Sequence, residues 1–305
     1  MAPLPNPKVL LPILTSFLFA GSFIAGKYTT VALGPLTTTL LRYMIALGVL
    51  GLFVGRSVNP AKMLTVARTD WGAMALLGLF GVVGYHYFFF ISLRHTATAN
   101  TAIINAFNPV VTGIMAALFI GERLTRRQYG GIALALVGVL TLLTRGSLAK
   151  LLTLELNRGD GLMLCAVLCW VVYSLIIKQL SQRYSGLTIT FYAAVAGVGQ
   201  LLVLASLEQW WQQVATLSIS SLIAILYMGV AASGIAYLLF NLSIQQVGPT
   251  RTASVVYSLV PIFVAALAWL FFREPLTTAM VASMGLILLG VNLVLRPPKK
   301  IKSRY

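Results

Sequence analysis

Long apolar runs, separated by short polar and charged segments, recur along the whole chain. A helix needs about 20 predominantly apolar residues to cross the hydrocarbon core, and most of the runs approach that length. They are far longer than the roughly 9–11 alternating residues of a membrane strand. The pattern therefore predicts ten membrane-spanning helices, at about Leu10–Thr30, Leu36–Val54, Trp71–Leu93, Thr98–Ile120, Gln128–Leu143, Gly161–Gln179, Leu187–Leu207, Ile219–Leu242, Thr252–Phe272 and Thr278–Leu295.

Composition supports the same class. Hydrophobic residues make up 59% of the chain and charged residues 9%, so a soluble fold would lack a polar exterior. The sequence predicts an all-α integral membrane protein whose first partner is the lipid bilayer. The formal charge of +16 reflects the scarcity of acidic residues, of which there are six, and no basic stripe suggests nucleic-acid binding. The two cysteines, Cys165 and Cys169, share one helix face and give neither a disulfide framework nor a metal set. No cofactor and no catalytic group is predicted.

Lysine and arginine placement predicts the orientation in the membrane. With the N-terminus inside, fifteen basic residues fall on the cytoplasmic side and five on the other, which agrees with the positive-inside rule. Both termini are therefore expected to be cytoplasmic, in a multi-pass protein of the cell (inner) membrane. The short N-terminal "MAPLPNPK" precedes a run too long for a signal peptide, so we expect it to stay on the mature protein.

The two halves of the chain repeat each other. Over most of each half the offset is 151 residues, which pairs Phe19 with Trp170, Lys27 with Lys178 and His86 with Tyr237. Nearer the C-terminus of each half the offset is 152, which pairs Pro109, Glu122, Leu124 and Gly138 with Pro261, Glu274, Leu276 and Gly290. Five spans per half is an odd number, so the second half must run in the opposite direction through the membrane. The expected organisation is two inverted five-helix repeats, 1–145 and 161–296, a connection at 146–160 and a basic cytoplasmic tail at 297–305. The sequence of the connection is equally consistent with a short interfacial helix and with a solvated loop. Inverted repeats are common in transporters, with the site near the midplane.

These residues resemble a known family. The stretch "FAGSFIAGKYTTVALGPLTTTLLRYMIA" and the blocks ending in "GERLT" and "REPLT" are similar to the EamA family of the drug/metabolite transporter superfamily. The resemblance covers about residues 10–296. It implies a ten-helix transporter, commonly an exporter of amino acids or other small metabolites, whose third, fourth, eighth and ninth spans line a central cavity. One departure is Phe19, which stands where the family usually has tryptophan, while Trp170 keeps that residue in the second half.

Two basic residues, Lys27 and Arg42, lie inside the first two predicted spans. Charges at this depth are costly and usually face a partner or a water-filled cavity. One interpretation is that they snorkel outward or cap nearby carbonyls. The other is a cationic outer mouth that binds a substrate carboxylate.

All six carboxylates fall at the ends of spans or in connections. A buried anion for lipophilic cations is thus missing, and so is the usual proton-coupling group of small multidrug exporters. His86 is the candidate proton carrier, because its pKa can lie near neutrality, although a satisfied structural histidine is the more ordinary interpretation.

Polar and aromatic residues gather in the spans that the family uses for its cavity. The candidates for substrate binding are Lys27, Arg42, Tyr85, His86, Asn105, Asn108, Trp170, Tyr173, Tyr237, Asn241, Ser254, Tyr257 and Ser258. For the serines and asparagines, interhelical hydrogen bonds are an alternative explanation. Pro109 and Pro261 occupy equivalent positions inside their spans, where a kink could act as a hinge.

The main functional hypothesis is a secondary transporter, an exporter of small zwitterionic, anionic or neutral metabolites such as amino acids or their derivatives. A nucleotide-sugar or sugar-phosphate antiporter is the alternative within transport, although it would need more basic residues in its cavity. A membrane receptor or scaffold is the alternative outside transport. An intramembrane enzyme is disfavoured, because the chain lacks paired membrane carboxylates, HExxH and GxSxG.

Overall fold

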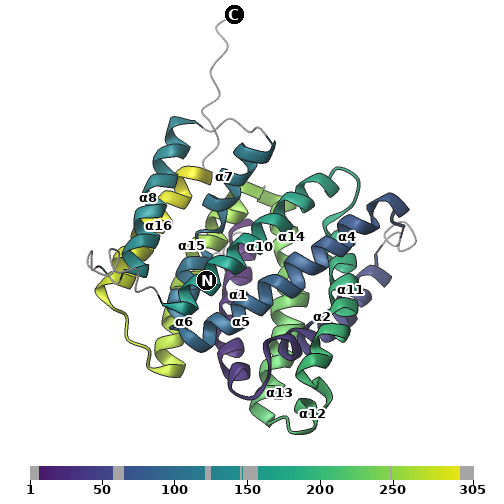
Figure 1. The fold of residues 1–305 in the computed structure, drawn as a ribbon. Coiled ribbons are helices and arrows are strands. Elements are labelled where there is room, and N and C mark those ends of the chain that lie inside the picture. Colours follow the sequence, from purple (N-terminus) through teal and green to yellow (C-terminus); the bar gives the residue numbers. More distant parts are fainter. Residues whose placement is uncertain are drawn as a thin grey trace, which may run out of the picture.

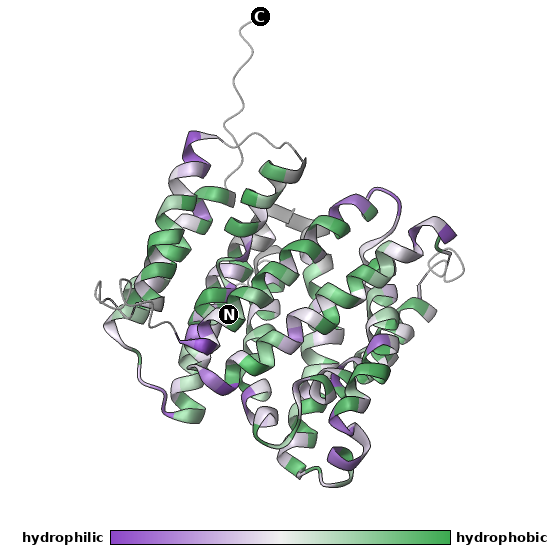
Figure 2. Cartoon of the chain, in the orientation of Figure 1, coloured by the Kyte–Doolittle hydropathy of each residue, from purple (hydrophilic) through white to green (hydrophobic). Residues whose placement is uncertain are grey.

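The structure, a computed structural model, describes residues 7–57, 65–120, 125–144, 146, 157–247 and 249–295. Within these residues the regular structure is helical throughout. Seven stretches are long and apolar enough to cross a membrane: Leu10–Ala32, Pro35–Gly55, Arg68–His95, Arg158–Leu180, Gly186–Glu208, Ile219–Phe240 and Val255–Phe272. In Figure 2 hydrophobic residues run along the helices, and the most hydrophilic ones gather mainly at helix ends and connections. The chain is therefore a multi-pass membrane protein.

The first half begins with two uninterrupted helices, α1 (Pro7–Ala32) and α2 (Pro35–Gly55). The third apolar run is composite and comprises η1 (Arg68–Asp70), α4 (Trp71–Leu77), the π-helical η2 (Gly78–Gly84) and α5 (Tyr85–His95). The fourth is broken after its second turn into α6 (Thr98–Asn105) and α7 (Asn108–Ile120). The fifth is α8 (Arg126–Leu143), which a capping box at Thr125 begins.

The second half follows the same plan. Its elements are α10 (Arg158–Leu180), α11 (Gly186–Leu204), η3 (Ala205–Glu208), α12 (Trp210–Ala215), α13 (Ile219–Leu226), the π-helical η4 (Tyr227–Ile235), α14 (Ala236–Val247), α15 (Pro249–Phe272) and α16 (Thr278–Leu295). Nine of the ten predicted apolar ranges are helical wherever they are described, the fourth is interrupted at 106–107, and seven of the ten correspond to the candidate spans. The fourth range is broken, and α8 and α16 are short, so the count of ten remains a prediction.

The contacts between the halves come in exchanged pairs. α2 packs on η4 and α11 packs on η2, while α1 packs on α14 and α15 and α10 packs on α5, α6 and α7. α8 packs on α16, its own counterpart, and the two lie side by side at one edge of the bundle in Figure 1. Two matched hydroxyl pairs follow the 151-residue offset, Ser92 with Thr101 at 3.3 Å and Ser243 with Thr252 at 2.9 Å. Such reciprocity is what two similar units related by an approximate two-fold axis would produce.

Both π-helical segments also obey the offset, since Gly78 opens η2 and Gly229 lies 151 residues further on in η4. A Cβ added to Gly78 would lie 2.6 Å from the backbone nitrogen of Gly197 on α11, and one added to Gly229 would lie 2.6 Å from Cβ of Ile45 on α2. Glycine therefore lets each π turn lie directly against a helix of the other half. π-helical turns are rare and are frequent at functional sites.

The α8–α16 pair is equally close. A Cβ on Gly290 would lie 2.5 Å from the carbonyl oxygen of Gly131 and 2.8 Å from the backbone nitrogen of Ala135. These neighbours are backbone atoms, which cannot rotate aside. Small residues at such crossings allow the close packing that holds membrane helices together.

We expect Gly290→Ala to lower the free energy of unfolding by about 1–3 kcal/mol, because the added methyl overpacks this contact. Gly285→Ala is the matched control on the same helix, since nothing lies within 4 Å of its Cβ position. Thermal unfolding in detergent measures both variants. A Gly290→Ala protein as stable as the Gly285→Ala protein would contradict the close α8–α16 contact.

Candidate functional site

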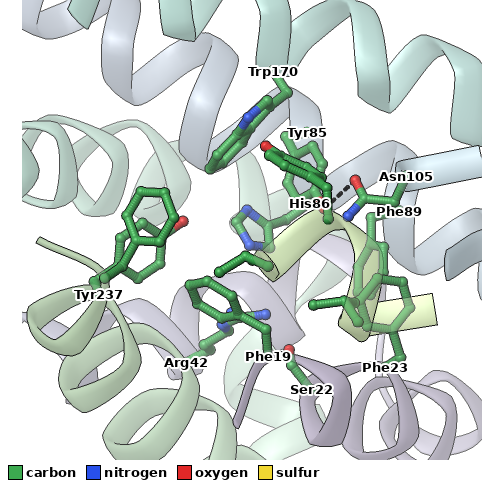
Figure 3. A pocket seen from close by; sticks show the side chains of 14 residues that line it. Phe19, Ser22, Phe23, Arg42, Tyr85, His86, Phe89, Asn105, Trp170 and Tyr237 are labelled. Atoms are coloured by element: carbon green, nitrogen blue, oxygen red, sulfur yellow. Dashed lines mark hydrogen bonds between the residues drawn. The ribbon is translucent and has the colours of Figure 1, made fainter. Parts of the chain in front are cut away.

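A small cavity of about 90 Å³ lies where the two halves meet. α1, α2, α5 and α6 contribute from the first half, and α10, α14 and α15 from the second. Its lining comprises Phe19, Ser22, Phe23, Arg42, Tyr85, His86, Phe89, Asn105, Trp170, Tyr237, Phe240, Val256, Tyr257 and Val260. In the view of Figure 3, Trp170 and Tyr85 lie above, and Arg42, Phe19 and Ser22 lie below.

Aromatic rings form most of the wall. Tyr85 contacts Trp170 with the ring centroids 5.1 Å apart, and it stacks on Phe89 at 5.9 Å. Across the cavity, Phe19 meets Tyr237 edge to face at 5.5 Å. Rings in such offset and edge-to-face contacts give a stiff apolar wall whose π faces can still attract a cation.

Arg42 is the basic residue of this lining. Its side chain is only 4% exposed, and its Nε donates to Ser233 Oγ at 2.6 Å. The guanidinium carbon also lies 5.9 Å from the ring centroid of Tyr43. Within the part of the chain that the structure describes, Arg42 forms no ion pair with a carboxylate. A buried charge without a counter-ion is costly, so the cavity is suited to an anion.

The described carboxylates have other roles at helix ends. Asp70 pairs with Arg183 at 3.3 Å and accepts from Tyr184 Oη at 2.7 Å, and Asp160 accepts from Thr96 Oγ1 at 2.6 Å. Glu208 accepts from the backbone nitrogen of Thr37 at 2.8 Å and thereby caps the start of α2. None of the described carboxylates lines the cavity.

Asn105 brings an amide to the cavity from the end of α6. Its Oδ1 accepts from Tyr85 Oη at 3.2 Å and from Asn108 Nδ2 at 2.7 Å. Both lone pairs of that oxygen are thus occupied, and the Asn105 amide can offer its N–H groups to a ligand. His86 is 2% exposed, and its Nδ1 lies 3.0 Å from the carbonyl oxygen of Val82.

Seven of the residues singled out from the sequence line this cavity: Arg42, Tyr85, His86, Asn105, Trp170, Tyr237 and Tyr257. Asn108 donates a hydrogen bond to the side chain of Asn105, and Tyr173 packs on Trp170 with the ring centroids 5.0 Å apart. The Ser258 hydroxyl lies 3.5 Å from Asn292 Nδ2. The side chains of Asn241 and Ser254 lie outside the described part of the structure.

The sequence analysis missed several lining residues, namely Ser22, Phe23, Phe89, Phe240, Val256 and Val260, and it named Phe19 only as a departure from the family pattern. The repeat offset held a signal for some of them. Phe89 and Phe240 are 151 residues apart, as are Asn105 and Val256, and both members of each pair line the cavity. The pairs His86–Tyr237 and Phe19–Trp170 have the same offset, and all four residues line the cavity.

Lys27 does not line this central cavity. Its Nζ donates to the carbonyl oxygens of Leu93 and Thr96, at the C-terminal end of α5. It lines a second cavity of about 590 Å³, which we call the Lys27 cavity, together with Arg94, His95, Thr96, Ala97, Asn100, Leu142, Asn157, Glu274, Thr277, Thr278, Ala279 and Met280. Of the two interpretations of Lys27, the cap on nearby carbonyls matches these contacts, and Lys27 does not line the central cavity with Arg42. Free carbonyls at a helix C-terminus attract cations, which accounts for an ammonium here.

The connection between α5 and α6 is held from both halves. Glu274, in the "REPLT" block, accepts from the backbone nitrogen of Thr98 at 2.8 Å and from its Oγ1 at 2.9 Å, and so caps the start of α6. Arg94 Nε donates to the carbonyl oxygen of Thr30 at 3.0 Å. Because α6 ends at Asn105, this cap helps to set where the cavity amide lies.

The two predicted hinge prolines have different settings. Pro109 lies in the first turn of α7, just after the break at 106–107, where its missing N–H costs nothing. Pro261 lies inside the uninterrupted α15. Their role as hinges remains a prediction.

A bundle of apolar helices, built as two similar halves around a small cavity with one buried arginine among its described lining residues, defines a membrane protein of the transporter class. The sequence profile of the EamA-like transporter family matches residues 6–144 and 157–296, once per half. The chain belongs to the EamA-like transporter family.

Curated relatives are named as transporters. The uncharacterized transporter YyaM of Bacillus subtilis is 27% identical over 296 residues, which cover 96% of both chains. A probable terminal-alkyne amino-acid exporter of Streptantibioticus cattleyicolor is 26% identical and covers 93% of this chain and 92% of its own. An S-adenosylmethionine/S-adenosylhomocysteine transporter of Chlamydia trachomatis serovar L2 is 24% identical and covers 96% and 90%.

The fold has a solved counterpart. A crystal structure with 19% sequence identity superposes with a TM-score of 0.63 and covers 94% of this chain and 96% of its own. At this identity the likeness concerns the fold alone.

We expect Lys27→Met to lower the free energy of unfolding by about 1.5–3 kcal/mol, because it removes charged hydrogen bonds to the end of α5. Lys27→Arg, which keeps the charge and the donors, should restore most of the loss. In thermal unfolding with ligand, the ratio of affinities for an amino acid and its amide, which lacks the carboxylate, should stay unchanged. A selective loss of the amino acid would instead assign Lys27 to substrate binding.

Proposed function

We propose that the protein is a secondary transporter that exports small metabolites of the amino-acid class by alternating access through the central cavity. The buried Arg42 carries this proposal, because it lines an aromatic cavity without a described carboxylate partner. Two relatives support it by name, since alkyne amino acids, S-adenosylmethionine and S-adenosylhomocysteine all contain an α-amino-acid group.

In this proposal Arg42 binds the substrate carboxylate. A guanidinium presents N–H groups in a planar fork that fits both oxygens of a carboxylate. The substrate ammonium then lies against the π faces of rings such as Tyr85 and Trp170, because no described carboxylate lines the cavity. Asn105 donates a further hydrogen bond. Together these groups suit a zwitterion better than a lipophilic cation.

The size of the cavity supports alternating access. The cavity volume of about 90 Å³ is well below the roughly 300–1,000 Å³ of typical small-molecule pockets. A bound metabolite needs more room, so the aromatic wall must move apart when substrate enters. The two halves are the natural moving units, because the lining residues come from both.

We further propose that the halves are inverted five-helix repeats, giving ten spans within 1–145 and 161–296, joined by 146–160 and followed by the basic tail at 297–305. The exchanged contacts between the halves and the two matches to the family profile support this arrangement. The distribution of basic residues supports cytoplasmic termini in a cell inner membrane.

The coupling of transport can involve a proton. His86 is the histidine of the cavity lining, and the described carboxylates lie elsewhere. It is therefore the proposed carrier if export is driven by protons.

The alternatives fit the site less well. A nucleotide-sugar or sugar-phosphate antiporter has to neutralise phosphate groups, and the described lining offers a single arginine. A receptor or scaffold has no need of a cavity between two moving halves. Uptake or efflux of an amino acid in vesicles separates both of these from the proposed carrier.

The Arg42→Met variant tests whether Arg42 binds the substrate carboxylate. Loss of a charged hydrogen-bonding partner of a carboxylate should weaken binding of a zwitterionic amino acid by about 1–3 kcal/mol, or roughly 5–150-fold. The corresponding amide, which keeps the ammonium but has no carboxylate, should lose little. The measurement is ligand-dependent thermal unfolding of the purified protein with a panel of common L-amino acids and their amides, with Arg42→Lys as the charge-conserving control. Equal losses for acid and amide would exclude Arg42 as the carboxylate anchor.

The orientation is tested with reporters. An enzymatic reporter fused after Tyr305, active only in the cytoplasm, should be active, and one active only outside should be silent. The reason is the fifteen-to-five distribution of basic residues between the two sides. An external reading would overturn the orientation.

A further inference from the structure

The two halves differ in chemistry at the position of Arg42. By the 151-residue offset, Arg42 of α2 corresponds to Ala193 of α11, and Ser233 of η4 corresponds to Val82 of η2. The second half thus offers an internal comparison: the same two elements meet with alanine and valine in place of arginine and serine. Val82 and Ala193 are both buried, and they border one very small cavity of about 10 Å³.

This comparison separates packing from function. At the equivalent positions the η2–α11 contact has Val82 and Ala193 and no arginine–serine pair, so the fold of the repeat does not require that pair at η4–α2. An arginine and a serine that are 4% and 1% exposed are more costly to bury than the alanine and valine of the other half. Their presence in only one half points to a purpose other than packing.

The backbone brings Ser233 to Arg42. A Cβ on Gly229 would lie 2.9 Å from the carbonyl oxygen of Arg42, and one on Gly234 would lie 2.6 Å from Val49 Cγ1. The π-helical η4 therefore lies directly against α2. At this separation a side chain as short as serine reaches the guanidinium, and Ser233 Oγ accepts from Arg42 Nε at 2.6 Å.

We propose that Ser233 is a positioning residue for substrate selection: it orients the Arg42 guanidinium so that the remaining N–H groups face the cavity and select a carboxylate. This inference rests on the proposed function of Arg42 as the carboxylate anchor. An arginine side chain has several rotatable bonds, and a bidentate carboxylate contact needs one plane of the fork. Ser233 holds Nε at one edge of that plane, and Nη1 and Nη2 form the opposite edge.

The test compares acid and amide selectivity in Ser233 variants. The ligands are the common L-amino acid that stabilises the wild-type protein most in thermal unfolding, and the amide of that amino acid. The measured quantity is the ratio of the two dissociation constants. Ser233→Ala should lower the preference for the acid by roughly 5–10-fold, the cost of about one hydrogen bond. Ser233→Thr keeps the hydroxyl and should retain the preference.

Further variants fix the interpretation. Ser233→Val copies Val82 of the other half, so it should fold and lose the preference as Ser233→Ala does. Ser243→Ala removes another buried serine, one that bonds Thr252 and lies outside the cavity lining, and it should leave the ratio unchanged. In an Arg42→Met background, Ser233→Ala should have no further effect on the ratio, because the two residues act as one unit.

The outcomes separate this inference from the proposed function. If Arg42→Met abolishes the preference and Ser233→Ala leaves it intact, Ser233 does not position the anchor. If Ser233→Ala and Ser233→Thr lower it equally, the effect is one of packing and the inference fails. If Arg42→Met itself keeps the preference, or no amino acid stabilises the wild type, the proposed function fails first.

Discussion

A charged guanidinium buried among membrane helices is the feature on which the account of this protein depends. Ionised groups at such depth are costly, and proteins retain them where they meet a partner, a cavity or a substrate. Arg42 meets Ser233 and the edge of an aromatic cavity, and within the described residues it has no carboxylate partner. The carboxylates that are described hold helix ends instead. The cavity therefore carries an unbalanced positive charge, which a substrate anion can balance.

The similarity of the two halves explains how the Arg42 guanidinium is held in place. Each half packs on the other through exchanged contacts, and glycines in η2 and η4 bring the π turns against α11 and α2. The shared architecture supplies a paired aromatic lining, such as Phe89 with Phe240. The departure from symmetry, Arg42 with Ser233 against Ala193 with Val82, supplies the chemistry. Because the Arg42–Ser233 bond joins the two halves, its geometry depends on their relative position, which is the variable that alternating access changes.

Much of the fold could be predicted from the apolar runs, because helix length and hydropathy follow directly from bilayer thickness. The break in the fourth span before Pro109 could not be predicted, because the equivalent Pro261 lies in a continuous helix. Of the site, the residue types and the spans were predictable, and seven of the candidates line the cavity. For Lys27 the sequence left two interpretations open, because depth in the membrane does not tell whether a side chain points to a cavity or to the carbonyls of a neighbouring helix end. The structure has the ammonium on the carbonyls. The pairing of Phe89 with Phe240 was visible in the repeat offset, but an apolar ring in an apolar helix gives no signal of its own.

The most direct measurement is a structure of the protein with an amino acid bound. The account predicts a widened central cavity in which the substrate carboxylate lies about 2.7–2.9 Å from the Nη groups of Arg42, while Nε still donates to Ser233. It also predicts the substrate ammonium against the aromatic faces of the wall. A substrate carboxylate bound elsewhere, for example on Lys27 in the Lys27 cavity, or Arg42 paired with a carboxylate of the protein itself, would contradict it.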